Sequence, residues 1–241
     1  MSTRLSGGTL RGDRRHRRSR LAPVAMILLF CVAVVTTGCI DLPPKAAAAT
    51  PTPTHRPPGK SVVFIGDSLT VGLYASTIDT TFASLLAVRW KATLLDRVGV
   101  AGVQADGLRA AVQTMEPDAT DTVVEVGTND FVKLSPEEFS LSYRALITAV
   151  KRREPHAQIV CLGLWRSATE RSPTGQGPDV YDALIQAACP GPFIPLLGLF
   201  MIPSNRGPAN QETFRGLSDA FHPNDRGHDA IASAIAAEVK P

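Results

Sequence analysis

The stretch Phe64-Ile65-Gly66-Asp67-Ser68-Leu69-Thr70 decides the fold that this chain is expected to adopt. The apolar residues at 62–65 are typical of a buried β-strand, and the residues after the stretch follow a helical pattern. The turn between them places the hydroxyl group of Ser68 at the carboxyl end of a strand. Ligands bind at this edge of open α/β sheets, because loops converge there and helix N-termini offer free N–H groups. Ser68 is therefore a candidate nucleophile, and helix capping is the alternative role for Ser and Asp in such a turn.

Short apolar segments alternate with helical patterns along the rest of the chain. We expect further strands at 93–98, 122–126, 158–164 and 193–197, and helices at 105–115, 136–153, 180–189 and 224–239. This order predicts a three-layer α/β/α sandwich with a central, mostly parallel five-stranded sheet. The polar segment 165–178 is expected to be a loop, and two roles stay open for it and for Trp165: a wall of a substrate pocket or a solvent-exposed loop.

The amino terminus has the pattern of a targeting segment, residues 1–38. Five arginines between positions 14 and 20 precede an apolar stretch at 21–35 that is too short and too poorly flanked for a confident membrane span. The following Thr36-Thr37-Gly38-Cys39 resembles a bacterial lipoprotein signal, in which Cys39 would be lipidated. Such signals usually carry Leu three residues before the cysteine, where this chain has Thr36. Ordinary cleavage nearby and an uncleaved anchor therefore remain open.

Residues 39–60 are expected to form a tether, because six prolines surround a run of four alanines there. An anchor, a tether and then a domain at 61–241 predict an exported protein held at the outer side of the cytoplasmic membrane, with secretion as the alternative. The domain is long enough to bury a core, at about 70% of its extended surface.

The net charge of +3 gives a misleading picture of the domain. The first 38 residues carry seven Arg and one Asp, which leaves a net charge of −3 from Cys39 onward. The only short basic run in this part, Lys151-Arg152-Arg153, is explained by the end of a helix. We therefore expect no nucleic-acid partner.

Two of the four cysteines, Cys161 and Cys189, fall in the domain. In an oxidising compartment they could pair as a disulfide. Each could equally remain a small buried side chain, because their separation in space does not follow from the sequence.

Four polar segments are expected at one edge of the sheet. Three of them, 66–68, 99–102 and 127–130, follow strands, and the carboxyl ends of parallel strands share an edge. The fourth, 219–224, precedes the last helix and can fold onto the same edge. With two residues between them, Asp219 can reach a ring nitrogen of His222 and leave the other nitrogen free to act as a base.

In these four segments the chain resembles the GDSL-type esterases of the SGNH hydrolase superfamily, over about residues 61–239. The resemblance rests on the sequences GDSL at 66–69, GVAG at 99–102, GTND at 127–130 and DAFHP at 219–223, in the order of the family. It implies a flavodoxin-like SGNH hydrolase fold and a serine esterase that needs no cofactor. One departure is Arg97, where many relatives have Asn before the glycines of the second segment.

The resemblance also implies the roles of the site residues. Ser68 would be the nucleophile, His222 the base and Asp219 the residue that orients it. The Ser68 backbone, Gly102 and Asn129 would form the oxyanion hole. The simpler alternatives are a turn glycine at Gly102 and a loop-capping amide at Asn129.

The expected substrate is an acyl ester, including an acetyl ester, of a carbohydrate, lipid or small molecule, and the alternative is an inactive binding or scaffold domain of the same fold. We expect a monomer whose membrane contact is limited to the anchor. We also expect no metal site, because no His or Cys pair lies close in the sequence. Asp67 and Asp130 are expected to brace their loops, and His228 is expected at the surface.

Overall fold

The computed structural model describes residues 59–239. The targeting segment at 1–38, Cys39 and all but the last two residues of the tether lie outside the described residues. Within the described part, no helix is long and apolar enough to cross a membrane.

Five parallel strands form the central sheet, in the spatial order β2-β1-β3-β4-β5. The strands are β1 (Ser61–Gly66), β2 (Thr93–Gly99), β3 (Asp121–Glu125), β4 (Gln158–Leu162) and β5 (Phe193–Ile194). The α/β fold class and the parallel five-stranded sheet are confirmed. β4 and β5 are shorter than the apolar runs suggest, because the chain turns away from the sheet after Leu162 and Ile194.

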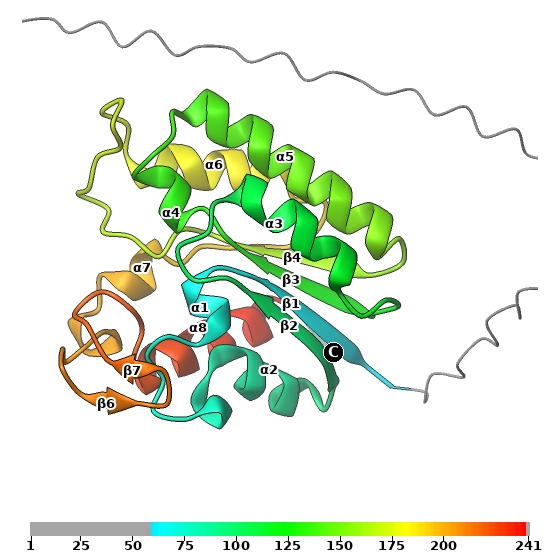
Figure 1. Ribbon diagram of the computed structural model, residues 1–241, viewed down its shortest axis with the longest axis horizontal. Helices are drawn as coiled ribbons and strands as arrows, with labels where there is room; N and C mark the ends of the chain where they lie inside the picture. The colour runs from blue at the N-terminus through cyan, green and yellow to red at the C-terminus, as the bar shows by residue number, and fades with distance from the viewer. Residues whose placement is uncertain (1–58, 240–241) are drawn as a thin grey trace, which may run out of the picture. The chain divides into compact units, whose positions relative to one another are not determined.

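Helices cover both faces of the sheet (Figure 1). The main ones are α2 (Phe82–Trp90), α3 (Ala105–Ala111), α5 (Pro136–Arg153), α6 (Pro178–Ala188) and α8 (Asp225–Glu238). Helices α3, α5 and α6 share a core with one face of the sheet, and α2 and α8 share a core with the other. β1 lies inside the sheet and is buried at every position, which explains why its sequence is a continuous apolar run.

The ends of α5 agree with the residue pattern at 135–153. Ser135 caps the helix by accepting the N–H of Glu138, whose carboxylate accepts the Ser135 N–H in return. Pro136 takes the first helical position, where its missing N–H costs no hydrogen bond. Three basic residues fill the last turn, where positive charge complements the helix dipole.

The sequence has weak periodicity over 198–220, and residues 197–217 fold into short elements. They are α7 (Leu197–Phe200), the 3-10 helix η3 (Pro203–Asn205) and a two-stranded hairpin of β6 (Glu212–Thr213) and β7 (Gly216–Leu217). Other short elements are α1 (Ser68–Val71), η1 (Ile78–Thr80), η2 (Val112–Thr114) and α4 (Thr128–Phe131). The sequence does not predict the hairpin, because two-residue strands are too short to show a period.

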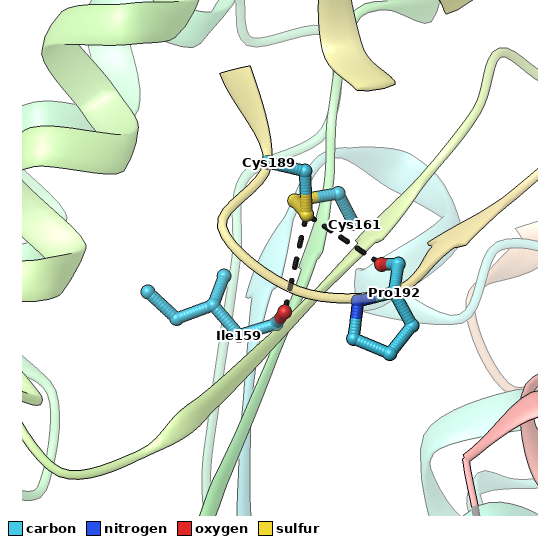
Figure 2. The surroundings of a disulfide bond; sticks show 4 residues. All are labelled: Ile159, Cys161, Cys189 and Pro192. Atoms are coloured by element: carbon cyan, nitrogen blue, oxygen red, sulfur yellow. Dashed lines mark hydrogen bonds between the residues drawn. A yellow bond between two sulfur atoms is a disulfide. The ribbon is translucent and has the colours of Figure 1, made fainter. Parts of the chain in front are cut away.

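Cys161 of β4 and Cys189 at the end of α6 form a disulfide, with 6.0 Å between their Cα atoms. The carbonyl oxygens of Ile159 and Pro192 lie 3.9 and 3.5 Å from the sulfur of Cys189. Both point toward the disulfide (Figure 2). A disulfide sulfur carries no proton, so these are contacts and not hydrogen bonds. The pairing ties α6 to the strand that it follows.

Candidate active site

Ser68, His222 and Asp219 lie together at the carboxyl edge of the sheet. The Oγ atom of Ser68 is 2.9 Å from Nε2 of His222, and Nδ1 of His222 is 2.8 Å from a carboxylate oxygen of Asp219. Ser68 is the first residue of α1, directly after β1 and Asp67. The contact joins residues 154 positions apart in the chain. The arrangement can therefore pass a proton from the serine hydroxyl to the histidine ring.

Asp219 organises the loop that carries His222. Its Oδ1 atom accepts the backbone N–H groups of Phe221 and His222 at 2.9 and 2.8 Å, and its Oδ2 atom faces the His222 ring. Burial alone would raise the pKa of Asp219, but these hydrogen bonds and the nearby ring outweigh it and hold the pKa below the usual value. Asp219 is therefore ionised at neutral pH and favours the His222 tautomer with a proton on Nδ1.

The turn that holds Ser68 is fastened by Glu125, at the end of β3. Its Oε2 atom accepts the N–H groups of Asp67 and Thr70, each at 3.2 Å, and the Thr70 hydroxyl at 3.0 Å. Glu125 lies outside the four polar segments that the sequence predicts for the site. The available signal was one acidic residue among the valines of the expected strand 122–126, since a buried carboxyl group needs partners.

Asp67 caps α1 and connects Ser68 with Asn129. Its Oδ1 atom accepts the Leu69 N–H at 3.1 Å and lies 3.3 Å from the Ser68 hydroxyl, and its Oδ2 atom accepts the Asn129 amide at 3.0 Å. Burial raises the pKa values of both Asp67 and Glu125, and the charge of Asp67 raises that of Glu125 further. Two neighbouring buried carboxyl groups therefore hold a proton more tightly than exposed ones.

The other two proposed oxyanion donors differ in their present partners. Gly102 adopts a φ of +75°, and a Cβ atom built there meets no atom within 4 Å, so its backbone is open to a ligand. Within residues 59–239, the N–H groups of Ser68 and Gly102 donate to no other group. The Asn129 amide instead donates both to Asp67 and to the Val103 carbonyl oxygen, each at 3.0 Å.

Contacts between loops hold these segments together. The Val100 N–H donates to the Gly66 carbonyl oxygen at 3.1 Å, which fixes the loop after β2 beside the turn after β1. The Ala105 N–H donates to both carboxylate oxygens of Asp130, whose pKa burial raises to about 6. Asp67 and Asp130 thus brace their loops as predicted. Arg97 of β2 donates to the Thr81 hydroxyl at 2.9 Å.

Trp165 takes neither of the two roles that the sequence left open. Its side chain is fully buried, its ring packs edge-on against Phe200, and its Nε1–H donates to the Phe221 carbonyl oxygen at 2.8 Å. The indole thus supports the loop that carries His222 from beneath.

The prediction of a surface position for His228 is wrong. Its ring is fully buried and stacked on Phe82, and its Nδ1 atom accepts the Phe82 N–H at 3.3 Å. His228, Ile231 and Ile235 follow helical spacing on the face of α8 that packs against α2, which explains the burial. Burial lowers the pKa of His228 to about 4, so its ring is neutral at pH 7.

Within residues 59–239, no group of three or more His, Cys, Asp or Glu side chains could hold a metal ion.

Comparison with solved structures supports the fold. The esterase EstA from Pseudoalteromonas sp. has a TM-score of 0.55 and 15% identity, covering 75% of this chain and 97% of that one. Phospholipase A1 from Streptomyces albidoflavus NA297 has a TM-score of 0.54 and 15% identity, covering 75% of this chain and all of that one. A family two carbohydrate esterase from Clostridium thermocellum, solved with cellohexaose, has a TM-score of 0.55 and 18% identity, covering 75% of this chain and 63% of that one.

Comparison with curated protein sequences gives no match. The sequence profile of the GDSL-like Lipase/Acylhydrolase family matches residues 64–230, which span the strand before Ser68 and most of α8. The chain therefore belongs to the GDSL-like lipase/acylhydrolase family and is a hydrolase of ester bonds.

Proposed function

We propose that this chain is a serine esterase in which Ser68 is the nucleophile, His222 the general base and Asp219 the residue that orients the His222 ring. One observation carries the proposal: the two successive hydrogen bonds of 2.9 and 2.8 Å that join these three side chains. A serine hydroxyl is a weak nucleophile at neutral pH unless a base accepts its proton.

In the proposed reaction, Ser68 Oγ attacks the ester carbonyl carbon while its proton passes to Nε2 of His222. The negative charge that forms on the carbonyl oxygen would be met by the N–H groups of Ser68 and Gly102 and by the Asn129 amide. The ester C–O bond then breaks, and His222 returns the proton to the leaving alcohol. Water then loses a proton to His222 and attacks the acyl carbon, the bond between this carbon and Ser68 Oγ breaks, and His222 returns the proton to Oγ, which releases the acid and restores Ser68.

The proposed substrates are acyl esters, including acetyl esters, of carbohydrates, lipids or small molecules. A carbohydrate esterase and a phospholipase among the similar structures support this range. Fold similarity alone does not decide between them, because specificity depends on the site and not on the fold.

Replacing Ser68 with alanine tests the proposal. In S68A, hydrolysis of p-nitrophenyl acetate should fall by more than about 10³-fold, because the nucleophile is lost. The matched control is Ser233→Ala, which changes an exposed serine of α8 and should leave the rate unchanged. If circular dichroism shows a folded protein and the rate in S68A is unchanged, Ser68 is not the nucleophile.

A catalytically inactive binding or scaffold domain is the second candidate. It is favoured by the Asn129 amide, both of whose contacts are already made within the protein. To act on an oxyanion, this amide has to break or share one of these bonds. The test is labelling of the full chain by a fluorophosphonate probe, followed by peptide mapping. Covalent labelling of Ser68 supports the esterase, and its absence supports the binding domain.

We also propose that the protein is exported and anchored through a lipid on Cys39. The proposal rests on the basic and apolar pattern of residues 14–35 before Gly38-Cys39. In a bacterial host, Cys39→Ser should move the protein from the membrane fraction to the soluble or secreted fraction. Unchanged membrane association in that variant would contradict lipidation at Cys39.

A further inference from the structure

Arg166 contacts two of the segments that build the candidate active site. It follows Trp165 directly in the loop after β4, and its side chain is only 15% exposed. The reaction proposed above assigns no role to Arg166. The inference below rests on that reaction and concerns what this arginine does for it.

The first contact of Arg166 is with the segment that carries Asn129. Its guanidinium donates from both Nε and Nη2 to the Thr128 carbonyl oxygen, at 3.2 and 3.0 Å. This oxygen belongs to the peptide unit that joins Thr128 to Asn129. Two donors held in one rigid plane fix the direction of that peptide better than a single donor does. Arg166 therefore orients the backbone from which the Asn129 amide extends.

The second contact of Arg166 is with the segment that carries His222. Its Cζ atom lies 4.7 Å from the centre of the Phe221 ring, within the range of a cation–π interaction. The Phe221 ring in turn meets the His222 ring edge-on, with 5.1 Å between the ring centres. Arg166 therefore packs on the side chain that packs on the catalytic ring.

The remaining contacts of Arg166 hold its guanidinium in place. Its Nη1 atom donates to Oε2 of Glu170 at 3.0 Å. The other carboxylate oxygen of Glu170 accepts the Ser167 N–H at 3.1 Å. The guanidinium is thus fixed by its own loop as well as by the two site segments.

Trp165 contacts the same two residues as Arg166. Its backbone N–H donates to the Thr128 hydroxyl at 3.1 Å, and its Nε1–H donates to the Phe221 carbonyl oxygen at 2.8 Å. Two consecutive residues of the loop after β4 therefore each join the residue before Asn129 to the residue before His222.

A purely structural arginine is the simpler alternative, and this chain holds one with the same hydrogen-bond pattern. Arg153, the last residue of α5, donates from Nε and Nη2 to the Met115 carbonyl oxygen. Neither Arg153 nor Met115 belongs to the four polar segments of the site. Arg166 differs from Arg153 because it joins two of these segments to each other.

We propose that Arg166 is a positioning residue of the esterase, which sets the distance between the Asn129 amide and the His222 ring. In the proposed reaction, the amide has to meet the carbonyl oxygen while the ring exchanges a proton with Ser68 Oγ, so both groups must be in place at the same time. A misplacement of about 1 Å can lower the rate of such a reaction by about 10²-fold.

Arg166→Ala tests the inference with p-nitrophenyl acetate as the substrate. We expect kcat to fall by about 10- to 100-fold and KM to stay within about twofold, because the lost contacts act on the transition state and not on the binding of the ester. Arg166→Lys keeps the charge but not the planar fork of donors, and it should lose kcat in the same way. The matched control is Arg153→Ala, which loses an equivalent contact with a carbonyl oxygen and should leave kcat unchanged.

Hydrogen–deuterium exchange measures the effect of Arg166 on the two segments without any substrate. In both Arg166 variants, residues 127–131 and 219–223 should exchange faster than in the wild type, because local opening becomes easier. In Arg153→Ala, the exchange of both segments should equal that of the wild type.

The outcomes separate this inference from the proposed function. A wild-type kcat in a folded Arg166 variant, a loss confined to KM, or unchanged exchange in either segment overturns the positioning role and leaves Ser68 as the nucleophile. If the wild type hydrolyses no ester, the proposed function fails instead. The exchange data then decide alone: faster exchange in both segments supports their connection through Arg166, and unchanged exchange overturns it.

Discussion

Glu125 shows how one buried side chain can position a nucleophile that it does not touch. It accepts three donors from Asp67 and Thr70, the residues on either side of Ser68 and Leu69. Burial and the neighbouring charge of Asp67 raise the pKa of Glu125 well above its usual value, and all three donors meet its Oε2 atom. A neutral amide should therefore replace this carboxyl group better than a small apolar side chain.

We predict that Glu125→Gln retains most of the activity, within a few-fold, and that Glu125→Ala loses stability and activity together. The alanine variant leaves the buried Thr70 N–H and hydroxyl without this acceptor, each at a cost of about 1–3 kcal/mol, whereas the Asp67 N–H keeps the backbone carbonyl oxygen of residue 125. The measurements are the free energy of unfolding in urea and kcat/KM for p-nitrophenyl acetate. Equal behaviour of the two variants would show that the Glu125 contacts do not hold the turn.

At the scale of elements, the neutral ring of His228 on α8 is buried where this helix packs against α2. The pKa of His228 is about 4 in the folded protein and 6.5 in an exposed histidine. Between these values the unfolded chain binds a proton that the folded chain does not, so this group destabilises the fold as pH falls from 6.5 to 4, by about 3 kcal/mol in total. Asp130 and Asp182, with pKa values of about 6, act in the opposite direction in the same range.

The prediction for His228 therefore concerns a difference between two proteins. His228→Gln should be less stable than the wild type at pH 7, because packing on Phe82 is lost. The gap, which is the difference in the free energy of unfolding between the two proteins, should shrink by about 3 kcal/mol as pH falls to 4. Urea unfolding at a series of pH values measures it. The control is Ser233→Ala, which changes an exposed side chain of α8 that carries no titratable group and should show a constant gap. A constant gap for His228→Gln as well would contradict a buried neutral ring.

The disulfide belongs to the same scale, because it joins β4 to the end of α6. It closes a loop of 28 residues, for which loop-closure entropy gives about 3–4 kcal/mol. The double variant Cys161→Ala/Cys189→Ala should lose stability of this order in urea unfolding. Reductant should destabilise the wild type and leave the double variant unchanged. Insensitivity of the wild type to reductant would argue that the cysteines are not paired in solution.

At the scale of the whole molecule, the site follows from the order of the strands. β1 lies between β2 and β3, so the turn that carries Ser68 is flanked by the loops that carry Gly102 and Asn129. Two separate cores, one on each face, hold the sheet. The chain returns through α7 and the hairpin to bring His222 to this edge, beneath which Trp165 donates to the Phe221 carbonyl oxygen.

The sequence by itself determined the layers, the parallel sheet and the four polar segments, because hydrophobic period and strand ends are local properties. It also determined the spacing of Asp219 and His222. With two residues between them, the carboxylate can reach the ring within a single turn. Their catalytic roles, and that of Ser68, stay predictions that the observed geometry supports.

Only the tertiary structure decided which side chains are buried against distant partners. It paired Cys161 with Cys189, buried His228 and Trp165, attached Glu125 to the turn of Ser68, and directed the Asn129 amide to Asp67. Each of these depends on contacts between residues far apart in the chain, where no local pattern fixes distance or direction. Burial and hydrogen bonding across elements are properties of the packed fold, and they set the charge state and the orientation of these groups.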